Sequence, residues 1–123
     1  MSGNNILLDS NIVIYLSQKK LTVNDVFEYN KKYSISIITY MEILSYNFPT
    51  KEEESFIRKI LSLFEIIDIS KDIANKVIEL KKTRKIKLPD AIIVATALKY
   101  NYILYTNDKQ LHTINNLKIK YIY

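Results

Sequence analysis

Four acidic side chains stand out because each lies where an apolar, strand-like segment ends or where the next helix-like segment begins. They are Asp9 in LLDSN, Glu42 in SIITYMEIL, Asp90 in KLPDAIIVATAL and Asp108 in YTNDKQ. Asp9 and Glu42 have strongly apolar neighbours, among which an unpaired charge is costly. Carboxylates that lie close together also raise one another's pKa unless a cation neutralises them. If the fold brings these acids together, a bound cation would be needed to neutralise their mutual repulsion.

The ligand types indicate which cation suits such a site. The chain has no Cys and a single His, so the acids would supply an all-oxygen set of ligands. Oxygen ligands favour hard divalent ions such as Mg²⁺ or Mn²⁺ over zinc. Such an ion lowers the pKa of a bound water and stabilises an oxyanion leaving group, which is the chemistry of metal-dependent phosphodiester cleavage. The formal net charge of +5, from 18 Lys and Arg against 13 Asp and Glu, also favours a polyanionic partner.

Short apolar segments alternate with helical patterns, and this alternation predicts the elements that position the acids. Strand-like segments rich in Ile, Leu and Tyr occupy residues 4–9, 33–38, 64–69, 101–106 and 114–123. Helical patterns occupy residues 11–17, 23–30, 39–46, 50–64 and 71–85, and an apolar helix begins at Pro89. The alternation predicts an α/β domain with a central, mostly parallel sheet of about five strands. Ligands bind at the carboxyl ends of such strands, so we expect all four acids at one edge of the sheet.

Each acid also has a purely structural explanation. Asp9 begins an Asp-Ser-Asn sequence, which is good turn chemistry, and Asp108 could be a turn or helix-capping residue. Asp90 follows Pro89 in the first turn of a helix, where a negative charge meets the positive end of the helix dipole. Glu42 has the weakest structural explanation, because a short apolar helix does not need an acid. Taken singly, the three aspartates favour these explanations, but four acids at one sheet edge favour a metal site.

The composition predicts one domain spanning residues 1–123, large enough to bury a hydrophobic core. The absence of Cys fits a reducing compartment, and neither a signal peptide nor a membrane-spanning apolar run is recognisable. We therefore expect a cytoplasmic protein without a membrane partner. The basic run at residues 81–87 is more typical of a solvated helix end than of a binding surface, and His112 is more typical of a surface or capping residue.

The segments that contain the four acids resemble those of a known family. LLDSNIVIYL, SIITYMEIL, LPDAIIVATAL and YILYTNDKQL are similar, in this order, to the motifs of PIN-domain ribonucleases. Within that family they resemble the VapC-like toxins of bacterial and archaeal type II toxin–antitoxin pairs. LPDAIIVATAL is the most specific of the four, and the motifs together span most of the chain. The region between Glu42 and Asp90 matches only as a helical pattern. The resemblance implies a PIN-like, three-layer α/β/α fold.

The resemblance also implies an Mg²⁺- or Mn²⁺-dependent endoribonuclease. The acidic pocket would consist of Asp9, Glu42, Asp90 and Asp108. Asp9 and Asp90 would be direct metal ligands, whereas the other two acids would bind a second ion or orient the attacking water. The products of cleavage would carry a 5′-phosphate and a 3′-hydroxyl.

Further expectations from the resemblance concern the substrate and partners. Asn11 and Thr106 match small polar positions in the family motifs and would orient the substrate. The substrate would be structured RNA such as tRNA. The protein would form a homodimer, and a small antitoxin would hold it inactive by wrapping it and covering its active site.

Of three rival interpretations, the sequence argues against the first two. A phosphorylation receiver domain also gathers aspartates at strand ends, but it leaves Glu42 and Asp90 unexplained. A phosphatase of the haloacid-dehalogenase type needs a second Asp two residues after the first, where this chain has Asn11. The third alternative is a PIN-like RNA-binding or housekeeping RNA-processing domain without a toxin role, and metal-dependent cleavage would separate the enzyme from a binding module.

Overall fold

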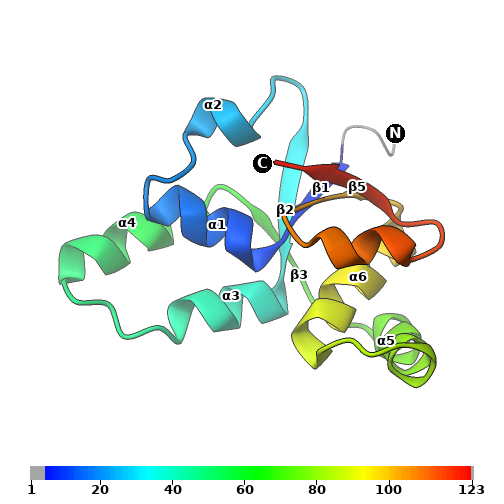
Figure 1. The fold of residues 1–123 in the computed structure, drawn as a ribbon. Helices are drawn as coiled ribbons and strands as arrows, with labels where there is room; N and C mark the ends of the chain where they lie inside the picture. The colour runs from blue at the N-terminus through cyan, green and yellow to red at the C-terminus, as the bar shows by residue number, and fades with distance from the viewer. Residues whose placement is uncertain (1–4, 123) are drawn as a thin grey trace.

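The computed structural model describes residues 5–122 and contains a five-stranded, wholly parallel sheet (Figure 1). Its strands are β1 (Asn5–Leu8), β2 (Lys32–Ser36), β3 (Glu65–Ile67), β4 (Ile103–Thr106) and β5 (Lys118–Tyr121). They lie side by side in the order β3-β2-β1-β4-β5, with β1 at the centre. The prediction of a parallel sheet of five strands is therefore confirmed. Asn4 and Tyr123, which fell within predicted strands, lie outside the described residues.

Helices cover both faces of the sheet, which makes three layers. The helices are α1 (Ser10–Ser17), α2 (Val23–Val26), α3 (Ile37–Leu44), α4 (Lys51–Leu61), α5 (Lys71–Thr83) and α6 (Leu88–Tyr100), with a short 3₁₀ helix, η2 (Lys109–Thr113). Successive side chains of a strand point to opposite faces. On β1, Ile6 and Leu8 pack with α1, α2, α3 and α4, whereas Leu7 packs with α5, α6 and η2. This arrangement confirms the expected α/β/α fold.

The apolar helix predicted to begin at Pro89 is α6, which is buried along most of its length. Every residue from Ala91 to Ala97 is buried, between the sheet and α5. A helix enclosed in this way needs no polar stripe, which explains its nearly unbroken apolar sequence. The helix ends at Asn101, whose φ of 57° places it in the left-handed region that closes many helices.

Several helix boundaries differ from those expected, and local capping explains the start of α3. The segment predicted as a strand to residue 38 is extended only as far as Ser36, because the Ser36 hydroxyl accepts the Ile38 N–H and starts α3 two residues early. The pattern at residues 23–30 forms a helix only as far as Val26. The caps predicted at Thr50 and Ser70 are present, each with its hydroxyl accepting a backbone N–H three residues on.

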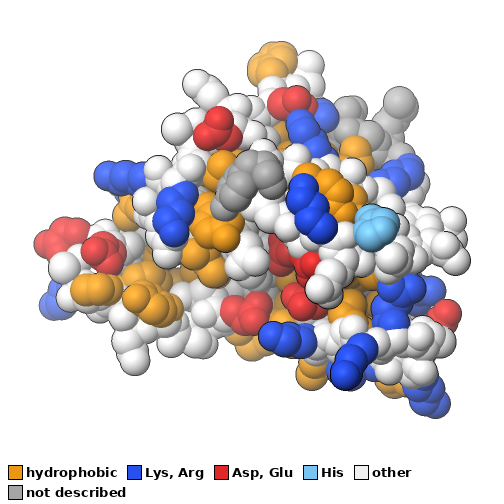
Figure 2. All heavy atoms as spheres, viewed as in Figure 1, with side chains coloured by type: hydrophobic (Ala, Val, Ile, Leu, Met, Phe, Trp, Pro, Cys, Tyr) orange, Lys and Arg blue, Asp and Glu red, His pale blue; other side chains and the backbone are white. Residues whose placement is uncertain are grey.

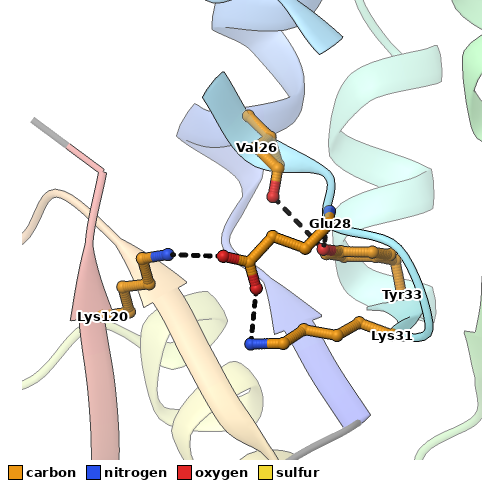
Figure 3. A network of polar contacts seen from close by, with 5 residues as sticks. All are labelled: Val26, Glu28, Lys31, Tyr33 and Lys120. Carbon is orange, nitrogen blue, oxygen red and sulfur yellow. Dashed lines mark hydrogen bonds and ion pairs between the residues drawn. The ribbon is translucent and has the colours of Figure 1, made fainter. Parts of the chain in front are cut away.

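A polar network connects the segment between α2 and β2 to the edge strand β5 (Figure 3). The Glu28 carboxylate lies 2.6 Å from the Lys31 ammonium and 3.6 Å from that of Lys120, on β5. The Tyr33 hydroxyl accepts the Glu28 N–H at 2.7 Å and donates to the Val26 carbonyl at 3.3 Å. Glu28 thus neutralises the charges of Lys31 and Lys120 and connects this segment to β5.

Over residues 5–122, no helix is long and apolar enough to cross a membrane.

Candidate active site

The four predicted acids lie on four different elements whose ends meet at the carboxyl edge of the sheet. Asp9 follows β1 and caps α1, and Asp108 follows the neighbouring strand β4 and caps η2. Asp90 lies in the first turn of α6, and Glu42 lies in α3. Figure 2 shows acidic side chains together near the middle of one face, over the region where α1, α3 and α6 meet in Figure 1, with Lys and Arg side chains around them.

Asp9 is the most enclosed of these acids, with 7% of its surface exposed. Its Oδ1 accepts the Ser10 N–H at 2.7 Å, and its Oδ2 accepts the Thr106 hydroxyl at 2.7 Å. Burial raises the pKa of Asp9, the two hydrogen bonds oppose that rise, and the charges of Asp108 and Glu42 add to it. The structural explanation of Asp9 as a helix cap is thus correct, but it leaves a buried acid beside two others.

Thr106 connects Asp9 to Asp108. The fully buried Thr106 hydroxyl donates to Asp9 and accepts the Asp108 N–H at 3.0 Å. Asp108 in turn accepts the Gln110 N–H through Oδ1 at 3.0 Å, which starts η2. One hydroxyl therefore fixes the separation of two acids that lie on adjacent strand ends.

Glu42 is joined to the first motif by a residue that sequence reasoning missed. The Ser10 hydroxyl lies 3.0 Å from Glu42 Oε1 and 3.0 Å from Thr39 Oγ1. With one proton to give, Ser10 donates to one of these acceptors at a time. Ser10 stands next to Asp9 in the sequence, but nothing local indicates that it contacts α3, which is far along the chain.

Asp90 is half-buried and lies within electrostatic reach of two other acids. Burial raises its pKa most, and the charges of Asp9 and Asp108 raise it further, whereas Lys87 opposes the rise. Burial and neighbouring acids therefore make the ionised forms of Asp9 and Asp90 unfavourable. An added cation would relieve that repulsion.

The described part of the chain does not supply this cation. Over residues 5–122, none of the four acids forms an ion pair with Lys or Arg. Lys109, the neighbour of Asp108, instead places its ammonium 4.0 Å from the centre of the Tyr121 ring. The same part of the chain contains no cluster of three carboxylate or imidazole groups that could hold a metal by itself. Mg²⁺ does not need such a cluster, because it is typically bound by one or two carboxylates, several waters and substrate phosphates. The residues present fit that mode of binding.

The two remaining candidates, Thr106 and Asn11, and the single His112 differ in burial and in contacts. Thr106 is hydrogen-bonded to both Asp9 and Asp108, as described above. Asn11 is exposed in the first turn of α1. His112 is exposed, and its Nδ1 lies 2.6 Å from the Lys109 carbonyl within η2. That contact is a local helical one, as the structural explanation of His112 predicted.

Known proteins share this fold and sequence pattern. A chain in the toxin–antitoxin complex from Klebsiella pneumoniae is 34% identical, with a TM-score of 0.76 over 96% of this chain and 98% of that one. A chain of VapBC2 from Rickettsia felis, solved with a DNA fragment from its promoter, is 26% identical, with a TM-score of 0.81 over 95% and 98%. DNA-bound VapBC from Salmonella typhimurium, at 19% identity and a TM-score of 0.84 over 97% and 98%, shares the fold. Among curated proteins, none matches by sequence.

The family model described as PIN domain matches residues 6–117, a range that contains all four acids. The resemblance to VapC-like toxins, carried by the four motifs, is confirmed by the Klebsiella and Rickettsia structures. The chain belongs to the PIN domain family.

Proposed function

We propose that the protein is the toxin of a toxin–antitoxin pair and that it cleaves RNA as a divalent-metal-dependent endoribonuclease. The observation that carries this proposal is the buried Asp9, which lies in the electrostatic field of other acids and has no basic partner among the described residues. Keeping such a charge without a counter-ion is unfavourable, and functional sites are where such arrangements are retained. The toxin role is supported by the toxin–antitoxin complex that contains the 34% identical chain.

The proposed roles of the pocket residues follow their positions. Asp9 and Asp90 would ligate Mg²⁺ or Mn²⁺, and Glu42 and Asp108 would hold a second ion or orient the attacking water. When bound, the metal lowers the pKa of a water and stabilises the charge that develops on the phosphate. Thr106 keeps the Asp9 carboxylate oriented through its 2.7 Å hydrogen bond. Asn11 is exposed in the first turn of α1, two residues after Asp9, and would contact and orient the substrate.

A groove beside the pocket suits the proposed antitoxin partner. It lies between α1, α3 and α4, has a volume of about 750 Å³, and has Glu42 in its wall. Its lining combines apolar side chains, including Ile14, Ile43, Tyr46 and Phe56, with polar and charged ones such as Lys19 and Glu53. Tyr46 and Phe56 are exposed at 64% and 42%. An apolar antitoxin segment in this groove would end next to the acidic pocket and could block it. A tRNA substrate and a homodimer are part of the same proposal.

The decisive experiment is cleavage of total cellular RNA by the purified protein. We expect discrete cuts with Mg²⁺ or Mn²⁺, none with EDTA, and none from Asp90→Asn. Asp68→Asn is the matched control, because Asp68 is an exposed acid outside the pocket and its substitution changes the net charge equally. Expression of the wild type and of Asp68→Asn should stop bacterial growth, whereas expression of Asp90→Asn should not.

The alternative is a PIN-like domain that binds or processes RNA without a toxin role. A folded wild type that binds metal and RNA but makes no cuts would favour the binding module. Metal-dependent cleavage without growth arrest would favour a housekeeping ribonuclease.

A further inference from the structure

The basic run at residues 81–87 lies where α5 passes into α6, directly before the turn that contains Asp90. Two of its five cations have structural tasks. The Lys81 ammonium donates to the Ile86 carbonyl at 2.7 Å, and Arg84 Nη1 donates to the Thr113 hydroxyl at 3.0 Å. Thr113 belongs to η2, the short helix that Asp108 caps. The loop is therefore fixed between two elements that each carry a pocket acid.

The fixed loop turns its other cations outward. Arg84 and Lys87 both have extended backbone conformations, and burial alternates along the segment: Arg84 and Ile86 are partly buried, whereas Lys85 and Lys87 are exposed. Alternate side chains of an extended segment lie on the same side, about 7 Å apart along the chain. Lys85 and Lys87 thus form a pair on the outer side of the loop, and Lys82 is exposed in the last turn of α5.

Among the described residues, five basic side chains form ion pairs with acids, and these three lysines are among the cations that do not. Elsewhere, Lys31 and Lys120 pair with Glu28, Arg58 with Glu54, Lys76 with Glu79 and Lys99 with Asp72. Over residues 5–122, no ion pair involves Lys82, Lys85 or Lys87. Lys87 is also the N-cap residue of α6, and Asp90 lies in the first turn of the same helix. Unneutralised positive charge therefore stands beside a pocket of negative charge.

We propose that Lys82, Lys85 and Lys87 bind the backbone phosphates of the RNA that flank the scissile phosphate. This inference rests on the proposed function, because an acidic pocket by itself repels a polyanion. Fixed cations at its border would hold the RNA against that repulsion and would place one phosphodiester over the acids. Lysines bind phosphates as point charges, without reading the bases, so the contact would act on RNA of any sequence.

The test compares Lys85→Gln/Lys87→Gln with Lys51→Gln/Lys59→Gln. Lys51 and Lys59 are exposed on α4, so the second variant makes the same change in net charge away from the loop. Steady-state cleavage of fluorescently labelled total cellular RNA, the substrate of the experiment described above, is measured with Mg²⁺ at several salt concentrations. We expect the loop variant to raise KM several-fold, with kcat unchanged. The slope of log(1/KM) against log[salt] should become shallower by about 1.4, or about 0.7 for each lost phosphate contact.

Further variants and controls separate the outcomes. Lys85→Arg/Lys87→Arg should keep the wild-type KM, and thermal unfolding should be unchanged in all variants because these side chains are exposed. Equal effects of the loop and α4 variants would overturn the inference, since only net charge would then matter. Wild-type KM and salt slope in the loop variant would overturn the inference and leave the proposed function intact. A wild type that cleaves no RNA would overturn both.

Discussion

Replacing Thr106 with Val tests whether one buried hydroxyl holds the acidic pocket together. Val has nearly the same shape as Thr, so the change removes the hydroxyl without opening a cavity. Two hydrogen bonds are lost: the one donated to Asp9 at 2.7 Å and the one accepted from the Asp108 N–H at 3.0 Å. The site is fully buried, so water cannot replace the hydroxyl without displacing packed side chains.

The expected loss of stability follows from these two bonds. A hydrogen bond to a charged group contributes about 1.5–3 kcal/mol and a neutral one about 0.5–1.5 kcal/mol. The additional buried methyl group of Val offsets about 0.8 kcal/mol of this. The free energy of unfolding should therefore fall by about 1–4 kcal/mol, and the melting temperature by about 3–5 °C for each kcal/mol.

The effect on the reaction should have a distinct pH signature. The Thr106 hydrogen bond lowers the pKa of Asp9, so its loss lets burial raise that pKa further. A metal-binding carboxylate must be deprotonated, so the pH below which Mg²⁺-dependent cleavage is lost should move upward in Thr106→Val. Thr106→Ser keeps the hydroxyl and should keep the wild-type pH profile.

Thermal unfolding and initial cleavage rates across a pH series measure both effects. A Thr106→Val protein with wild-type stability and pH profile would refute the assigned role of the hydroxyl. A Thr106→Ser protein as impaired as Thr106→Val would show that packing at this position matters and that the hydrogen bonds do not.

Two further predictions concern the stability of the folded protein, first without metal and then with Mg²⁺. Because the folded-state pKa values of Asp9 and Asp90 are raised, the stability that their protonation contributes is fully present below about pH 4 and is lost as the pH rises through the raised values. Asp9→Asn removes one of these titrating groups, so its urea-unfolding free energy should depend less on pH than that of the wild type; an unchanged pH dependence would contradict this. Saturating Mg²⁺ should raise the melting temperature of the wild type, by about 2.7 kcal/mol in stability at a hundredfold excess over Kd, but should not raise that of Asp9→Asn. Equal shifts in both proteins would place the ion elsewhere.

Local sequence patterns were sufficient to predict the strands, most helices and the common edge at which the acids lie. The period of apolar residues reflects which face of an element is buried. The continuous apolar runs of β1 and α6 therefore indicate that β1 is buried on both faces and that α6 is buried along most of its length. The position of α3 was less predictable, because the Ser36 cap competes with strand propensity over residues that suit either state.

The pocket was harder to predict in its details than in its acids. The contact of Ser10 with Glu42 spans 32 residues, and that of Thr106 with Asp9 spans 97. Both depend on which strands become neighbours, and apolar periodicity carries no information about strand order. Thr106 was a candidate only through the family resemblance, and Ser10 was not a candidate at all. Polar residues that position acids give a weak sequence signal, because Ser and Thr are common in turns and helix caps.

The span of the Thr106–Asp9 hydrogen bond has a consequence for the moment at which the acidic site forms during synthesis of the chain. β1 can pair with β2 as soon as residue 36 has left the ribosome, but the other side of β1 stays open until β4 has been made. Asp9 has no hydroxyl partner, and Asp108 does not exist, before that point. The acidic site of the nascent chain is therefore incomplete for most of its translation, and under the proposed function an antitoxin already present in the cell would meet the chain at the moment when the site is completed.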